Sequence, residues 1–83
     1  MNKNQILNKL KEISTWESLY CRPNEAYQTH LVFEFDDGNR ITYLEGNWNE
    51  RNHSRFLING NPVSMKQIIR NMELYISYEN KLN

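Results

Sequence analysis

The sequence predicts a small α+β domain in which a helix, a three-stranded antiparallel sheet and a second helix follow one another (αβββα), with both helices on one face of the sheet. Residues 27–36 alternate apolar and polar side chains, as a strand with one buried face does, and lead into Asp37-Gly38, a strong hairpin signal. Residues 65–76 repeat apolar side chains at the spacing of an amphipathic helix. Eighty-three residues support one core, so we expect residues 1–83 to form a single domain.

Residues 3–14 are expected to form the first helix. Its apolar side chains fall on one face, and Asn2 or Asn4 can cap its first turn by accepting a backbone N–H. The residues on that face are Ile6, Leu10 and Ile13, with Leu7 at the edge.

The segment after this helix has two interpretations. Residues 14–17 (Ser-Thr-Trp-Glu) have the spacing of a capping box, which favours a short second helix through Tyr20. The alternative is an extended segment over residues 15–21. Pro23 then ends regular structure, because the residue before a proline avoids helical geometry.

A hairpin joins the two strands around Gly38. A three-residue loop with Gly38 in the left-handed position places the apolar side chains of both strands on one face, whereas a two-residue loop scatters them. The favoured register pairs Phe33 with Ile41, Leu31 with Tyr43, Glu34 with Arg40 and Val32 with Thr42, while the alternative sets Phe33 opposite Thr42.

Residues 45–54 are polar except for Trp48 and are interpreted as the longest loop. Residues 55–59 read as a short third strand, and residues 60–62 (Gly-Asn-Pro) as a turn. The last helix begins after Ser64, which forms a capping box with Gln67. Its apolar stripe is expected to cover the hairpin and comprises Met65, Ile68, Ile69, Met72, Tyr75 and Ile76.

The charge balance bears on the partner. Ten basic and ten acidic residues give no net charge, which disfavours general affinity for phosphate backbones.

The single cysteine, Cys21, excludes an internal disulfide framework and suits a reducing compartment, so we expect a cytoplasmic protein. No apolar run has the length of a membrane span, so no membrane association is expected.

The order αβββα resembles that of double-stranded-RNA-binding domains, and the resemblance covers the whole chain. It implies RNA contacts from the first hairpin loop and from a lysine cluster that opens the last helix. Here the loop, residues 36–39, is acidic, and the last helix opens with one lysine, Lys66. The chain therefore departs from the family where RNA affinity needs positive charge.

Two surfaces are candidate binding sites. Trp48, Arg51, His53 and Arg55 combine an aromatic anchor with planar guanidinium donors, the side chains that dominate protein interfaces and that also bind nucleic acids. The alternative is that Trp48 covers the core while the arginines face solvent. A second patch, consisting of Asn71, Leu74 and Tyr78, lies away from the core-facing side of the last helix and would serve a partner or a dimer.

The sequence gives no basis for catalysis. The two histidines, His30 and His53, have no metal-ligand spacing to Cys21 or to each other, so neither a metal nor a cofactor is expected. His30 opposite Glu45 is the one imaginable acid–base pair, and such pairs on a solvated sheet face are usually without function.

We therefore expect a non-enzymatic binding module that acts on another protein. Small regulators and inhibitors encoded by phages or mobile elements have this profile. The alternatives are a nucleic-acid-binding domain that uses residues 48–55, and a dimerisation or assembly subunit, including a homodimer.

Overall fold

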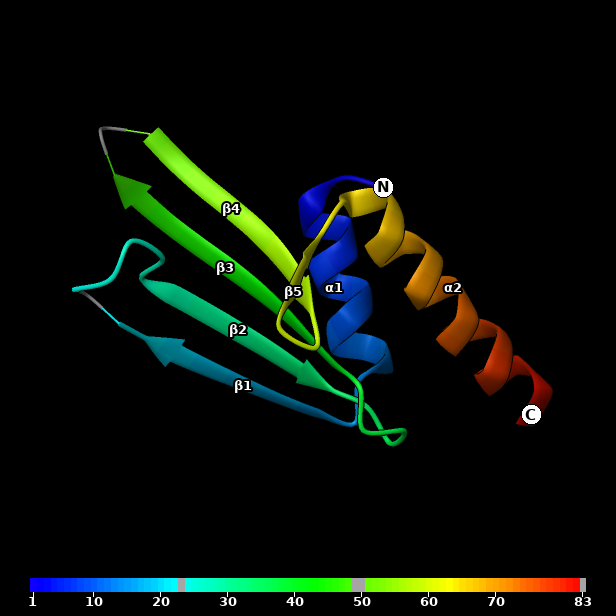
Figure 1. Cartoon of the computed structure of the whole chain (residues 1–83). Coiled ribbons are helices and arrows are strands. Elements are labelled where there is room, and N and C mark those ends of the chain that lie inside the picture. The colour runs from blue at the N-terminus through cyan, green and yellow to red at the C-terminus, as the bar shows by residue number, and fades with distance from the viewer. Residues whose placement is uncertain (23, 49–50, 83) are drawn as a thin grey trace.

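The computed structural model of the chain describes residues 1–22, 24–48 and 51–82, apart from the side chains of residues 48, 51, 52 and 78–82. Within these residues two helices flank five strands, as Figure 1 shows. Their bounds are α1 Lys3–Ile13, β1 Trp16–Cys21, β2 Thr29–Glu34, β3 Arg40–Trp48, β4 Arg51–Ile58, β5 Asn61–Val63 and α2 Met65–Leu82. The predicted three-stranded sheet is wrong, because five strands form it.

The strands form one antiparallel sheet in the order β1-β2-β3-β4-β5, so β3 is central and β1 and β5 are the edges. The hairpin between β2 and β3 has the predicted register, with Phe33 opposite Ile41 and Leu31 opposite Tyr43. Gly38 adopts a φ of 86°, which an L side chain rarely takes, and so closes the turn. The alternation of apolar side chains therefore fixed the pairing correctly.

Helix α1 begins at a capping box. The side chain of Asn2 accepts from the backbone N–H of Gln5, and the Gln5 side chain accepts from the backbone N–H of Asn2, both at 2.9 Å. Ile6, Leu10 and Ile13 are buried, as the spacing predicts. The helix ends when Ser14 takes an extended conformation, which directs the chain into β1.

The preferred interpretation of residues 14–20 as a short helix is wrong, and the extended alternative is right. Residues Trp16–Cys21 pair along the whole length of β2. The N–H of Thr15 donates to the carbonyl of Glu34 at 2.9 Å, so the pairing starts directly after α1. A helix of one or two turns is unstable alone, whereas β2 offers a row of backbone partners.

The interpretation of residues 45–54 as a loop is also wrong. Strand β3 continues to Trp48 and β4 begins at Arg51, with Glu45 opposite Ser54; residues 49 and 50 lie outside the described ranges. Residues 60–62 are not only a turn, because β5 pairs with Phe56–Ile58. Pro62 is compatible with β5 because this strand is an edge.

Helix α2 has the predicted capping box. The N–H of Ser64 donates to Oε1 of Gln67 at 2.9 Å, and the N–H of Gln67 donates to Oγ of Ser64 at 3.3 Å. Ile68 and Met72 are buried, and three stripe residues, Ile69, Tyr75 and Ile76, are half-buried. Met65, which was expected in the stripe, is 40% exposed at the first position of the helix.

Both helices pack on one face of the sheet and cover one end of it (Figure 1). The core consists of Ile6, Leu10, Ile13, Phe33, Phe35, Ile41, Tyr43, Phe56, Ile68 and Met72. Further along the strands the same face becomes polar, with Thr29 opposite Glu45 and Glu45 opposite Ser54. The molecule is elongated, 46 × 22 × 20 Å, because β3 and β4 extend past the helices.

Candidate functional site

The surface predicted from residues 48–55 belongs to a β-hairpin. Trp48 is opposite Arg51 at the end of the pairing between β3 and β4, and the side chains of both lie outside the described set. His53 is half-buried opposite Gly46. Arg55 is exposed, and its guanidinium carbon lies 5.7 Å from the centre of the Tyr27 ring. Arg55 is thus engaged by a cation–π contact within the chain.

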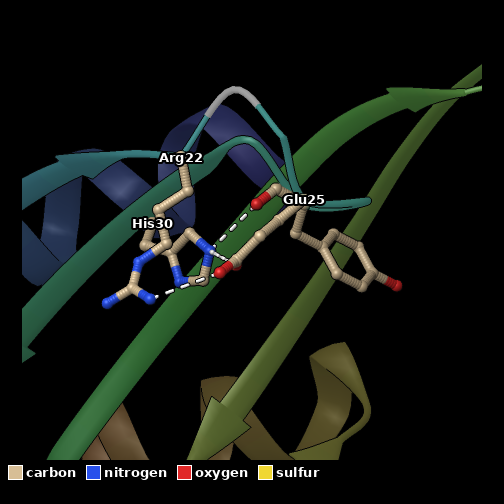
Figure 2. A network of polar contacts seen from close by, with 4 residues as sticks. Arg22, Glu25 and His30 are labelled. Carbon is tan, nitrogen blue, oxygen red and sulfur yellow. Dashed lines mark hydrogen bonds and ion pairs between the residues drawn. The ribbon is translucent and has the colours of Figure 1, made fainter.

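The loop between β1 and β2 folds back over the face of the sheet that the helices leave open. Figure 2 shows its polar contacts: Nη1 of Arg22 lies 3.4 Å from Oε1 of Glu25, and Nε2 of His30 lies 3.5 Å from Oε2 of Glu25. Nε2 of His30 is also 2.9 Å from the carbonyl oxygen of Tyr27. A Cβ at position 46 would overlap the carbonyl oxygen of Ala26, so Gly46 is what allows the loop to lie there.

These contacts hold the loop between β1 and β2 against the sheet. His30 is opposite Leu44 rather than Glu45, so the imagined acid–base pair is wrong. Glu45 lies on the helix-covered face, where its Oε1 is 3.5 Å from Nζ of Lys3 and accepts from the Tyr43 hydroxyl at 3.1 Å. Among the described residues, no group of three or more His, Cys, Asp or Glu side chains is placed to hold a metal ion.

A hollow of about 500 Å³ lies where the first turn of α2 meets β4 and β5. Two of its polar side chains, Ser64 and Gln67, bond to each other in the capping box, and a third, Lys3, pairs with Glu45. These groups are committed to helix capping and to an ion pair, so they have little capacity left to orient a small ligand.

The second predicted patch lies on α2. Leu74 is 67% exposed, as expected. The Asn71 side chain donates to the carbonyl of Gln67 within the same helix at 3.0 Å, and the side chain of Tyr78 is outside the described set. The apolar part of this patch that the structure describes is thus one exposed leucine, which is ordinary for a protein surface.

The concentration of apolar side chains on β1 is not ordinary. Trp16, Leu19 and Tyr20 are 65%, 62% and 50% exposed, and they lie within one six-residue strand. Trp16 and Tyr20 are on the open face of the sheet, and Leu19 is on the helix-side face, where it remains exposed. Exposed apolar side chains grouped in this way mark interaction surfaces.

The backbone of β1 is available along its outer side. The N–H of Arg22 donates to the carbonyl of Gln28 at 2.6 Å, and bonding alternates along an antiparallel pair, so even-numbered residues of β1 bond to β2. The N–H and C=O groups of Glu17, Leu19 and Cys21 therefore point away from the sheet, at its free edge (Figure 1).

The two edges of the sheet differ in how they are protected. On the far side of the sheet, β5 is three residues long, contains Pro62 and pairs with Phe56–Ile58, so the earlier part of β4 forms the rest of that edge. Short strands and prolines are common means of blocking unwanted pairing. Strand β1 has six residues, no proline and no lysine, and Glu17 is its single charge. We call the outward N–H and C=O groups of β1, together with Trp16, Leu19 and Tyr20, the β1 edge.

Sequence reasoning missed the β1 edge because it assigned these residues to a helix. Trp16 and Tyr20 favour strands by propensity, and that signal supported the extended alternative. Position at an edge depends on the pairing of all five strands, which the sequence did not reveal.

Within the described residues, no helix combines the length and apolar character needed to cross a membrane. Comparisons of the chain with protein-family models, with curated proteins and with solved structures find no match. A functional proposal therefore rests on the exposed backbone groups and apolar side chains of the β1 edge.

Proposed function

We propose that this chain is a non-enzymatic binding module that regulates or inhibits another protein. The observation that carries the proposal is the β1 edge, an unprotected six-residue strand with three large exposed apolar side chains. A partner in extended conformation adds a strand to such an edge, so that main-chain hydrogen bonds give affinity and alternate side chains give specificity. The surface of Trp48, Arg51, His53 and Arg55 stays a prediction for a second contact region.

The partner segment is defined by the chemistry of the edge. Its backbone bonds to Glu17, Leu19 and Cys21, and apolar side chains on both of its faces contact Trp16, Leu19 and Tyr20. A reducing compartment such as the cytoplasm suits this function, because Cys21 is exposed at the edge and oxidation would add a bulky group there.

The test uses proline to remove one outward N–H. Leu19→Pro deletes an N–H that points away from β2, so the pairing of β1 with β2 keeps its hydrogen bonds while an incoming strand loses one. Leu19→Ala is the matched control, since it shortens the same side chain and retains the N–H. Circular dichroism checks that both variants fold.

Affinity-tagged chain is incubated with host extract, with and without nuclease. The proposal expects a protein that the wild-type chain and, more weakly, Leu19→Ala retain after nuclease treatment, and that Leu19→Pro loses. Retention of all bound protein by a folded Leu19→Pro variant excludes the β1 edge. Loss of binding after nuclease treatment favours the alternative, a nucleic-acid-binding domain.

A further inference from the structure

The β1 edge has a pattern that fits a copy of itself. The outward backbone groups belong to Glu17, Leu19 and Cys21, which are spaced symmetrically about Leu19. Two antiparallel strands that are related by a twofold axis at Leu19 exchange hydrogen bonds between the two Leu19 residues, and between Glu17 of each and Cys21 of the other. This arrangement satisfies all of these outward groups with roughly six hydrogen bonds.

The side chains agree with this register. Antiparallel partners that lie opposite each other share a face, so Leu19 meets Leu19 on one face and Trp16 meets Arg22 on the other. Trp16 and Arg22 are both exposed, and a guanidinium over an indole is a favourable cation–π pair. No two like charges lie opposite each other, because Glu17 of each strand is opposite Cys21 of the other.

The neighbouring registers are less favourable. An axis at Ser18 places the carboxylate of Glu17 opposite Leu19, so a charge is set against an apolar side chain. An axis at Tyr20 sets Leu19 opposite Cys21 and leaves Trp16 beyond the paired residues. The axis at Leu19 is the one that matches apolar with apolar and cation with aromatic ring.

We propose that, in the absence of its protein partner, the β1 edge binds a second copy of this chain through antiparallel pairing about Leu19. The inference rests on the proposed function in that both occupants use the same edge, and it adds regulation. The homodimer covers Trp16, Leu19 and Tyr20, and a partner segment binds only when the dimer dissociates. One six-residue pairing is a small interface, so we expect a weak dimer that forms at roughly micromolar or higher chain concentrations and dissociates on dilution.

Analytical ultracentrifugation of the wild-type chain, from micromolar to millimolar concentration, measures the self-association. The expected result is a mass that rises from monomer towards dimer as the concentration increases. Leu19→Pro stays monomeric over the same range, and the control Leu74→Ala, on α2, behaves as the wild type does. A wild-type chain that stays monomeric at millimolar concentration overturns the inference.

Single cysteines test the register without proline. In a Cys21→Ser background, Leu19→Cys is expected to form an intermolecular disulfide under a glutathione redox buffer, because opposite Cα atoms in a strand pair are about 5.5 Å apart. Ser18→Cys in the same background is the matched control and stays largely monomeric, since it lies opposite Tyr20. Efficient cross-linking of Ser18→Cys with none for Leu19→Cys overturns the proposed axis.

These experiments separate this inference from the proposed function. A wild-type chain that stays monomeric, but whose partner is lost in Leu19→Pro, refutes the homodimer and retains the binding module. A chain that dimerises through Leu19, but whose partner is retained by Leu19→Pro, supports the homodimer and excludes the β1 edge as the binding site of the partner.

Discussion

The hydroxyl of Tyr75 donates a hydrogen bond of 2.8 Å to Oδ2 of Asp37, and this bond ties the middle of α2 to the turn between β2 and β3. Nδ2 of Asn39 donates to the same hydroxyl at 3.1 Å. The Tyr75 ring also stacks on Phe35, with centroids 4.1 Å apart and planes inclined by 11°. The two parts of this contact, polar and aromatic, can be removed separately.

Replacing Tyr75 by Phe removes the hydroxyl and keeps the stacked ring. We expect the variant to lose about 0.5–1.5 kcal/mol of unfolding free energy, the usual net value of one hydrogen bond. Tyr75→Leu, which also removes the stack on Phe35, should lose more. Urea denaturation measures both, and equal losses would mean that the stack contributes nothing.

The decrease of the unfolding free energy at alkaline pH should depend on the same hydroxyl. Burial, and then the bond to Asp37, raises the pKa of Tyr75 to about 12 from its ordinary value of 10.0. The folded state therefore holds the phenol proton more tightly than the unfolded state does, so this contribution is present below pH 10 and is lost as the pH rises towards 12. Tyr75→Phe should show a shallower decline between these values, and ultraviolet difference titration should assign the missing phenol.

The decrease of the unfolding free energy at acid pH should depend on Asp37. The backbone N–H of Asn39, and then the Tyr75 hydroxyl, hold the pKa of this carboxyl below its usual value. The folded state thus binds the proton less readily, and this contribution is present above the ordinary carboxyl pKa and is lost as the pH falls below it. In Asp37→Asn, the urea denaturation midpoint should decrease less as the pH falls than it does in the wild type. Glu73→Gln, which replaces an exposed carboxyl on α2, should retain more of the wild-type decrease.

The capping box of α2 gives a fourth prediction. Ser64→Ala leaves the N–H of Gln67 without its side-chain acceptor and should cost about 0.5–2 kcal/mol. Ser77→Ala, at an exposed position in the same helix, is the control and should be neutral or slightly stabilising because alanine favours helices. An unchanged denaturation midpoint in Ser64→Ala would exclude the cap as a source of stability.

Gly46 gives a fifth prediction. Its Cβ would overlap the carbonyl oxygen of Ala26, so Gly46→Ala should displace the loop between β1 and β2 and cost roughly 1–3 kcal/mol. Asn47→Ala, one residue along and exposed, should have little effect. Chemical shifts of Tyr27 and His30 should change in the Gly46 variant alone, and wild-type shifts there would mean that the loop does not rest on β3.

The elements that the sequence predicted correctly are those that bury one of their faces in the core. The alternation from Leu31 to Phe35 and the turn at Gly38 gave the register of β2 and β3, and the capping box gave the start of α2. Strand β1 gave no alternation because it buries neither face, and its Ser14–Glu17 spacing imitates a helix start. The ends of β3 and β4 were missed because the helices do not cover them, so their polar residues carry no burial pattern.

The candidate site was predicted less well than the fold. Trp48 and Arg51 were selected by residue type, which identifies side chains suited to binding but not their neighbours. Arg55 shows the limit, because Tyr27, distant in sequence, occupies its guanidinium face. The β1 edge depends on which strand is left outermost, and that is a property of the whole sheet.

The meander order of the sheet has a consequence for how the chain folds. Every pairing joins strands that follow one another, so each costs little loop-closure entropy and can form soon after synthesis. Helix α2 follows all five strands and carries Ile68 and Met72, which complete the core. The sheet can therefore assemble on the ribosome while its apolar face is covered by α1 alone, and in that interval the nascent chain is most exposed to aggregation and to chaperones.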